Sequence, residues 1–308
     1  MEIYQWRPVM EKLFSQSCDI NDLRAMALTA YWTGIIYRWL GVYQQASEYF
    51  EQALHVADQR GTFDVYARAL IEKTVVDRYQ GRIQSAQITA QVALDAFQRL
   101  EDGQGIERCL MELAQLALDR GQPTEALSQV EELTASARGA AITCNAHLML
   151  GNLKTAQRHA RQAIALASDD MSNQARARAI TGQVYLAMGR LHEAEDHLIL
   201  AISLLDQSGD VLARARAASS LGHVYQIQER FEEALTLLED TAAAQRSLRD
   251  DQGLYTTLET LVVVYSALVE MALQHGETDA ARAMAVTLQQ LDTELQSLLA
   301  RLEQKRMG

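Results

Sequence analysis

Small and apolar residues recur at helical spacing after a series of short turns. After Gly41, Ala46 follows at five positions, Phe50 at nine and Ala53 at twelve. Closely similar sets follow five further turn residues, namely Gly81, Gly121, Gly151, Gly189 and Glu229. Spacings of three and four residues place such side chains on one face of a helix. The pattern therefore predicts antiparallel helix hairpins that repeat every 30 to 40 residues.

A second pattern precedes three of these turns. Gly34, Gly182 and Gly222 are each followed three residues later by tyrosine, in "GIIY", "GQVY" and "GHVY". Glycine lets the partner helix of the hairpin approach closely, and tyrosine one turn on fills the space beyond it. Because one hairpin cannot bury its own apolar face, we expect the hairpins to stack.

Composition favours the all-α class. The 308 residues include only two prolines and are rich in Ala, Leu, Gln, Glu and Arg, which are helix formers. We expect a single array over residues 1–308. It would comprise an N-terminal capping helix in 1–21, six to seven repeats in 22–275 and a long C-terminal capping helix in 276–308.

Both ends carry apolar residues that could close such an array. Near the N-terminus, Trp6, Val9, Met10, Leu13 and Phe14 are expected on one face that covers the first repeat. The last helix carries a leucine-rich seam at spacings of three and four, comprising Ala281, Met284, Leu288, Leu291, Leu295, Leu298 and Leu302. This seam predicts packing onto the end of the array, with homodimerisation as the alternative.

Charge and cysteine content exclude several classes of protein. The net charge of −12 argues against a nucleic-acid partner. The three cysteines share no metal-ligand spacing and indicate reduced thiols, which favours a cytoplasmic location. The longest uninterrupted apolar run, from Leu261 to Val269, is too short to span a bilayer, and the N-terminus lacks a signal layout. We therefore expect a soluble protein without a membrane partner.

The repeated residues resemble those of the tetratricopeptide repeat (TPR) family. The glycine–tyrosine pair, the turn glycine, and the Ala, Phe and Ala of the first repeat match the family pattern, and the period near 40 is similar to the long-repeat subclass. G-protein-modulator scaffolds, kinesin light chains and maltose-type activators belong to that subclass. The resemblance implies a right-handed superhelix whose first helices line a concave groove. It also implies protein or peptide binding rather than catalysis.

The stripe that this resemblance places in the groove carries one row of arginines and one row of polar residues. The arginines stand six residues before the glycine position: Arg68, Arg108, Arg138, Arg176 and Arg216. One residue after that position stand Gln115, Asn145, Gln183 and His223. Guanidinium groups bind carboxylates through two hydrogen bonds, and amides can satisfy a peptide backbone. The stripe thus predicts an acidic, extended partner segment.

Pairing of these arginines with acids of the array itself is the alternative. Arg68 has Glu72 four residues on, and Arg108 has Glu112, so both are partly neutralised on their own helices. The other three arginines have no acid at that spacing and are the better ligand candidates. Arg178 and Arg214 lie on other faces of their helices, where surface or inter-repeat contacts are expected.

The first two repeats change the character of the groove. Tyr31, Trp39 and Tyr79 could hold an apolar anchor of the partner, or the N-terminal helix could cover them. "HEAEDH" spaces His192 and His197 five apart, rather than the four of a zinc helix motif. No nucleophile–base arrangement stands out. We expect no enzyme and no cofactor.

These observations predict a non-catalytic scaffold or adaptor that binds a protein or peptide in its groove. Two alternatives stay open. One is a regulatory sensor array that binds a signalling peptide or small ligand, and the other is a subunit that assembles through its leucine seam.

Overall fold

The computed structural model describes residues 3–60, 62–131, 133, 135–167 and 170–307. Within these residues the fold consists of fifteen helices and contains no strand, which confirms the all-α class. The helices are α1 (Ile3–Asp19), α2 (Leu23–Trp39), α3 (Tyr43–Arg60), α4 (Phe63–Tyr79), α5 (Ile83–Arg99), α6 (Gly103–Asp119), α7 (Pro123–Val130), α8 (Ala137–Met149), α9 (Leu153–Leu166), α10 (Met171–Ala187), α11 (Leu191–Ser208), α12 (Val211–Ile227), α13 (Phe231–Leu248), α14 (Asp251–Gln274) and α15 (Thr278–Met307).

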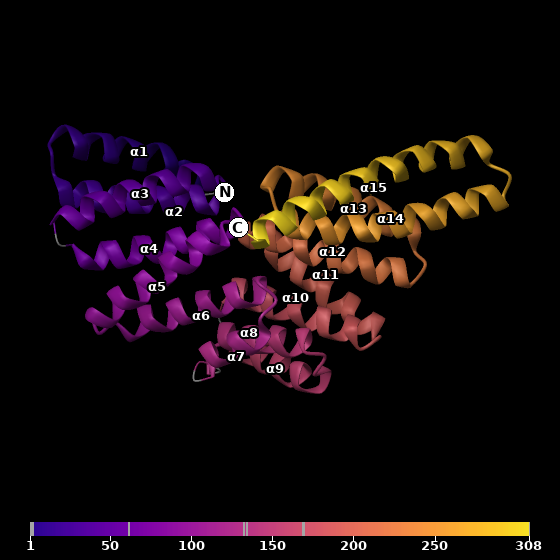
Figure 1. The fold of residues 1–308 in the computed structure, drawn as a ribbon, viewed down its shortest axis with the longest axis horizontal. Helices are drawn as coiled ribbons and strands as arrows, with labels where there is room; N and C mark the ends of the chain where they lie inside the picture. The colour runs from indigo at the N-terminus through magenta and orange to yellow at the C-terminus, as the bar shows by residue number, and fades with distance from the viewer. Residues whose placement is uncertain (1–2, 61, 132, 134, 168–169, 308) are drawn as a thin grey trace. The chain divides into compact units, whose positions relative to one another are not determined.

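The chain divides into two compact units, Met1–Ala135 (unit 1) and Ser136–Gly308 (unit 2). Unit 1 holds α1 to α7, and unit 2 holds α8 to α15. Inside each unit, helices consecutive in the chain lie side by side as hairpins (Figure 1). One continuous array over residues 1–308 stays a prediction.

Left-handed backbone marks the turn of each hairpin. The six turn glycines, the last of them Gly276, have φ between 72° and 77°, and Glu229 adopts φ 60° in the same place. A side chain is strained in this region, so glycine is the favoured residue there. The turn positions expected from the sequence are therefore confirmed, including the one where glutamate replaces glycine.

Most of the first helices of the hairpins begin at a capping side chain. In six of the seven, a carboxylate or hydroxyl oxygen accepts a hydrogen bond from a backbone N–H in the first turn; these caps are Asp22, Asp102, Ser136, Asp170, Asp210 and Asp250. Such caps satisfy N–H groups that the helix itself leaves unpaired. The polar loops between repeats therefore determine where these helices start.

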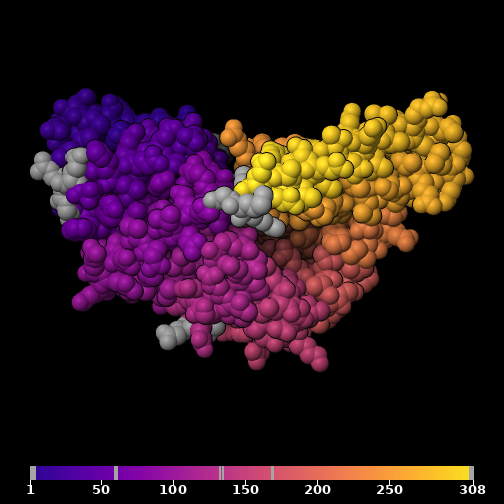
Figure 2. Space-filling model, viewed as in Figure 1, coloured from indigo at the N-terminus to yellow at the C-terminus, as the bar shows by residue number. Residues whose placement is uncertain are grey.

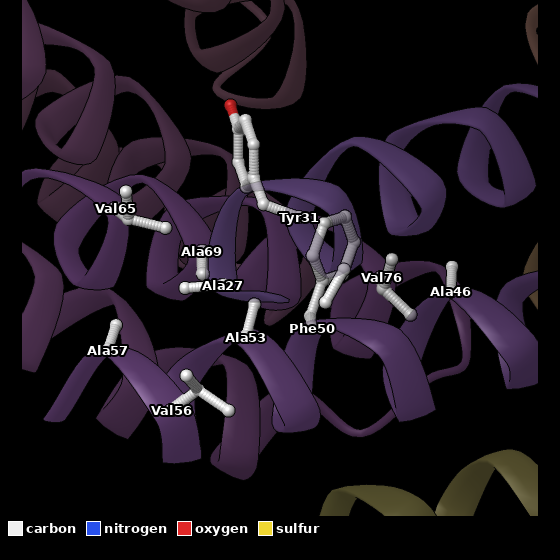
Figure 3. Close-up of a cluster of buried hydrophobic side chains, with 11 residues drawn as sticks. Ala27, Tyr31, Ala46, Phe50, Ala53, Val56, Ala57, Val65, Ala69 and Val76 are labelled. Atoms are coloured by element: carbon white, nitrogen blue, oxygen red, sulfur yellow. The ribbon is translucent and has the colours of Figure 1, made fainter. Parts of the chain in front are cut away.

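Small residues let the two helices of a hairpin approach closely. Figure 3 shows this for the first hairpin, where Phe50 lies among alanines of neighbouring helices. Ala46, Phe50 and Ala53 are fully buried. A Cβ atom added to Gly34 would lie 2.7 Å from the Phe50 ring, so only glycine fits opposite that ring. The repeated glycine and alanine positions thus form the core of each hairpin.

The N-terminal helix caps unit 1 with fewer residues than expected. Phe14 packs edge-on against Tyr49, with ring centroids 5.7 Å apart. Trp6, Val9 and Leu13 instead remain exposed. The expectation of one five-residue apolar face was wrong. Positions 10, 14 and 17 face the unit, whereas positions 6, 9 and 13 lie on another side of the helix.

The leucine-rich seam of α15 packs into unit 2. Leu298 is fully buried and Leu291 nearly so, in a cluster with Leu258, Leu261 and other residues of α13 and α14. Figure 2 shows the atoms of α15, in yellow, along an outer surface of unit 2. The seam therefore packs onto the end of the array, as expected, within unit 2. A homodimer stays a prediction and would have to use the exposed side of α15.

Helix α14 has a membrane-like length and composition. Of the described helices, it alone is long and apolar enough to cross a membrane by those two criteria. No such helix was expected from the sequence, because only runs of apolar residues that no charge interrupts were considered. The criteria met by α14 allow isolated charges within the helix. Leu254, Leu258 and Leu261 of α14 are buried against neighbouring helices. These contacts account for one side of α14, whereas Val263 and Leu273 are 48% and 56% exposed.

Candidate functional site

Two arginines of the predicted row in unit 2, Arg176 and Arg216, pair with aspartates of the following hairpin. Arg176 of α10 donates from Nη2 to Asp210 Oδ2 at 2.9 Å. Arg216 of α12 donates from Nε and Nη2 to the two carboxylate oxygens of Asp250, at 3.1 Å and 2.8 Å. Both aspartates stand 34 positions after their arginine. Arg176 and Arg216, which have no acid on their own helices, are therefore each paired across the repeat.

The same aspartates are helix caps. Asp210 accepts from the backbone N–H of Ala213 at the start of α12, and Asp250 accepts from that of Gly253 at the start of α14. Each carboxylate thus joins a helix N-terminus to the arginine of the preceding hairpin. Neither pair was predicted from the sequence, because no acid stands four residues after either arginine on its own helix. A capping aspartate at a constant distance of 34 is the sequence signal that could have found them.

Pairing leaves much of each guanidinium side chain at the surface. The Arg176 side chain is 44% exposed and that of Arg216 is 42% exposed. The carboxylate partner holds one edge of the group and so orients it. These two arginines therefore pair with acids of the array itself, which was the alternative to ligand binding. Their guanidinium groups nevertheless remain accessible to a ligand.

The polar row of unit 2 lies on the same helices. Gln183 of α10 donates from Nε2 to Ser220 Oγ of α12 at 3.2 Å. His223 is exposed, and partial desolvation by the surrounding protein lowers its pKa. We call these side chains the polar strip of unit 2, defined as Arg138, Asn145, Arg176, Gln183, Arg216 and His223. Because α8 contacts α10 and α10 contacts α12, the strip runs across neighbouring first helices.

The corresponding residues of unit 1 form a more buried charge cluster. Glu72 of α4 is 2% exposed and forms ion pairs with Arg108 of α6 and with Arg38 of α2, the latter with Nε 2.9 Å from Oε2. Arg108 therefore pairs with the acid of the preceding hairpin. The expected partial neutralisation by Glu112 on its own helix is present as well: although desolvation acts in the opposite direction, Glu72 and also Glu112 raise the pKa of Arg108. The packing of adjacent first helices adds the pair with Glu72, which the sequence did not predict.

A second set of ion pairs continues this cluster. Arg78 Nε lies 3.4 Å from Glu112 Oε2, and Arg78 Nη1 lies 3.5 Å from Asp119 Oδ2. The predicted groove residue Gln115 donates from Nε2 to the same Asp119 at 3.1 Å. Arg68, by contrast, is exposed and forms no ion pair with any residue that the structure describes.

The aromatic residues expected to hold an apolar anchor have different surroundings. The Tyr31 ring is only 7% exposed and packs near Phe50 (Figure 3). Tyr79 is engaged by Tyr43 and by the guanidinium of Arg78, 4.6 Å from its ring centroid. Trp39 is more than half exposed and is the one of the three that offers open aromatic surface.

Helix α1 contacts a different side of this region. It reaches α2 through the hydrogen bond from the Tyr37 hydroxyl to Glu11. Phe14 of the same helix packs on Tyr49 of α3. These contacts run along the edge of the first hairpin. Coverage of Tyr31, Trp39 and Tyr79 by the N-terminal helix stays a prediction.

The described residues hold no group of three or more His, Cys, Asp or Glu side chains arranged to bind a metal ion. His197 instead stacks on Tyr185, with ring centroids 5.4 Å apart. Burial raises the pKa of both the Cys109 and the Cys144 thiol to about 12, so these sulfurs are poor nucleophiles at neutral pH.

Family models for the tetratricopeptide repeat match residues 174–247, and also residues 108–132 and 137–162. No significant match occurs among curated proteins. The matched segments lie within helices α6 to α13.

Several solved structures share this fold at low sequence identity. A Rap protein complexed with competence and sporulation factor is 14% identical over 96% of this chain and 97% of that chain, with a TM-score of 0.62. The apo form of the quorum sensor NprR from B. thuringiensis is 14% identical over 94% and 83%, with a TM-score of 0.63. The Rap conjugation gene regulator of plasmid pLS20, in complex with the Phr* peptide, is 14% identical over 92% and 78%, with a TM-score of 0.61.

Proposed function

Because the chain carries tetratricopeptide repeats, we propose that it is a non-catalytic module that binds a protein or peptide partner. The polar strip of unit 2 is the observation that carries this proposal. Arg176, Gln183, Arg216 and His223 lie on successive first helices, and their polar ends reach the surface to different extents. A repeated row of this kind offers one recognition group per hairpin to an extended segment.

The chemistry of the strip suits an acidic segment. The guanidinium groups would bind carboxylates, and the amides of Asn145 and Gln183 would bind peptide groups. Asp210 and Asp250 hold two of the guanidinium groups in one orientation, which lowers the entropy that a ligand must overcome. The same aspartates offset part of the positive charge. The preference for acidic segments should therefore be moderate and should weaken with salt.

Similar structures support a peptide-binding role. One Rap protein is complexed with competence and sporulation factor, and the pLS20 regulator is in complex with the Phr* peptide. NprR is a quorum sensor. At 14% identity these likenesses support the class of function and leave the partner open. A regulatory sensor that binds a signalling peptide or small ligand is the second candidate, favoured by these same neighbours.

The proposal includes a cytoplasmic location and no cofactor. All three cysteines are free thiols, which is typical of a reducing compartment. An assembly role through the exposed side of α15 is the remaining alternative. A monomeric mass in solution, both for the full chain and for one lacking residues 285–308, would exclude it.

Selection from a library of linear peptides displayed on phage tests the proposal. We expect the immobilised full chain to enrich sequences rich in Asp and Glu. His223→Glu should weaken the selected peptides at least several-fold through charge repulsion and should leave stability unchanged, because His223 is exposed. Arg216→Gln should weaken them by about tenfold, the loss expected for one charge-assisted hydrogen-bonded pair.

Arg214→Gln is the matched control for the second variant. Arg214 carries the same charge and lies two residues from Arg216 on α12, but it points to another side of that helix, where it pairs with Asp206 of α11. This variant should bind as the wild type does. Failure to enrich any sequence, or binders that tolerate both strip variants while folding is intact, would refute the proposal.

A further inference from the structure

One polar side chain in the core of unit 2 lacks a hydrogen-bond partner. Gln245 of α13 is fully buried, and neither Nε2 nor Oε1 of its amide bonds to a residue that the structure describes. Burying an amide without a partner costs free energy, so a group of this kind calls for an explanation. Beside it lies the carboxylate of Asp250, which pairs with Arg216 of the polar strip.

Two other hairpins fill the same place with apolar side chains. Gln245, Leu205 and Phe97 each stand five positions before the aspartate that caps the next helix. Leu205 is fully buried, and Phe97 is 3% exposed. The core therefore accepts an apolar residue at this place, and packing alone does not account for an amide.

The glycine at position 253 brings the Gln245 amide next to the Asp250 carboxylate. Gly253 is the third residue of α14, and its backbone N–H donates to Asp250 Oδ1 at 3.2 Å. A Cβ atom on this residue would lie 2.7 Å from Gln245 Nε2 and closer still to Asp250 Oδ2. A hydrogen-bond donor and an acceptor are thus neighbours around the place where any other residue would have a side chain.

The preceding hairpin provides an internal comparison. There the glutamine is replaced by Leu205 and the glycine by Ala213. The side chain of its aspartate, Asp210, is 24% exposed, and the structure describes one hydrogen bond to it from Arg176. The side chain of Asp250 is 4% exposed and accepts two hydrogen bonds from its arginine. The more buried, forked pair therefore occurs where the amide and the glycine occur together.

The other charged side chains of this turn lie closer to the surface. Arg249 precedes Asp250 and is exposed, and Asp251 follows it and is partly exposed. The buried side of the Asp250 carboxylate is therefore left to the Gln245 amide and to the backbone N–H of Gly253.

We propose that Gln245 is a positioning residue for Arg216. Its Nε2 atom donates a hydrogen bond to Asp250 Oδ2 and so holds the carboxylate where it accepts both hydrogen bonds of the guanidinium group. The last torsion of a glutamine side chain is soft, so the amide turns toward the carboxylate without a change of rotamer. A donor on the buried side also offsets part of the cost of burying this charge.

This hydrogen bond makes Arg216 more rigid than Arg176. A guanidinium group that is held along one edge presents its remaining N–H groups in a fixed direction. A partner's carboxylate should therefore lose less free energy to ordering at Arg216 than at Arg176. This consequence rests on the proposed function, whereas the hydrogen bond from Gln245 does not.

NMR of arginine Nε–H protons tests the positioning in the full chain without a ligand. Gln245→Leu introduces the residue of the preceding hairpin, and Gln245→Met keeps the length of the side chain without its donor. In either variant we expect the Nε–H proton of Arg216 to exchange with water about threefold to tenfold faster, which is the factor for one hydrogen bond. The resonance is assigned by its loss in Arg216→Gln.

Two controls separate positioning from a general loosening of the core. The Nε–H proton of Arg246, on the same helix as Gln245, is bonded to Glu294 of α15 at 2.8 Å and should exchange at an unchanged rate. Gln252→Leu removes an exposed glutamine near the same cap and should leave both rates unchanged. An unchanged rate for Arg216 in the Gln245 variants, or equal acceleration of Arg216 and Arg246, would overturn the proposal.

A second arm tests the consequence for a ligand with an acidic peptide selected on the full chain. Gln245→Leu should weaken this peptide about threefold, and it should have no effect when Arg216 is already replaced by glutamine. An equal loss in both backgrounds would overturn the link to Arg216. Faster exchange at Arg216 with no peptide selected would refute the proposed function and leave the positioning role intact.

Discussion

Removing the charge of Glu72 should destabilise unit 1 strongly. This carboxylate is 2% exposed and is the shared partner of Arg38 and Arg108. Glu72→Gln keeps the shape of the side chain and leaves two guanidinium groups without their counter-charge. Breaking a buried pair in this way costs about 3–5 kcal/mol when the remaining charge is fully buried. Here the arginine side chains are 22% and 38% exposed. Water compensates in part, so we expect about 2–3 kcal/mol.

Urea unfolding followed by tryptophan fluorescence measures this effect. All three tryptophans lie in unit 1, so the signal reports that unit within the full chain. With an m-value of about 2 kcal/mol/M, the midpoint should fall by about 1–1.5 M. Glu51→Gln is the control, because Glu51 pairs with Lys73 at 3.1 Å but is 60% exposed, and it should cost less than about 1 kcal/mol. A Glu72 variant within the range of that control would refute the reasoning.

Three further predictions concern packing, backbone and thiol reactivity. Gly222→Ala places a Cβ 2.4 Å from Leu238, so it should cost about 1–3 kcal/mol of unfolding free energy by urea titration, with recovery when Leu238 is also reduced to Val. Glu229→Gly relieves a φ of 60° and should raise the free energy of unfolding by about 0.5–1 kcal/mol in the same titration. At pH 8, Ellman's reagent should titrate one thiol per native chain, that of the exposed Cys18. The thiols of Cys109 and Cys144 should not react, because burial raises the pKa of each to about 12. Rapid labelling of more than one thiol would contradict this assignment.

Much of the fold was predictable because it depends on local rules. Glycine or another residue in left-handed backbone ends each first helix, and small residues at spacings of three and four fit one helix against the next. Both signals are contained in short segments of sequence. The hairpins and their turns could therefore be predicted residue by residue, including the turn at Glu229.

The charge pairing was not predictable from such segments. Spacing along one helix predicted that Glu112 partly neutralises Arg108, but it gave no sign of the ion pair between Arg108 and Glu72 of the preceding hairpin. Likewise, no acid follows Arg216 on its own helix, yet Asp250 binds it from 34 residues away. The closest carboxylate is determined by how adjacent first helices pack, and helix periodicity alone carries no information on that distance.

The sequence by itself therefore determined the all-α class, the repeat, the turn positions and the register of the arginine row, because these depend on residues within a few turns of one another. Only the tertiary structure decided which arginines are paired and which, like Arg68, are not. Stacking brings together side chains 34 to 36 positions apart, and the free energy of a charge depends on those neighbours and on its burial.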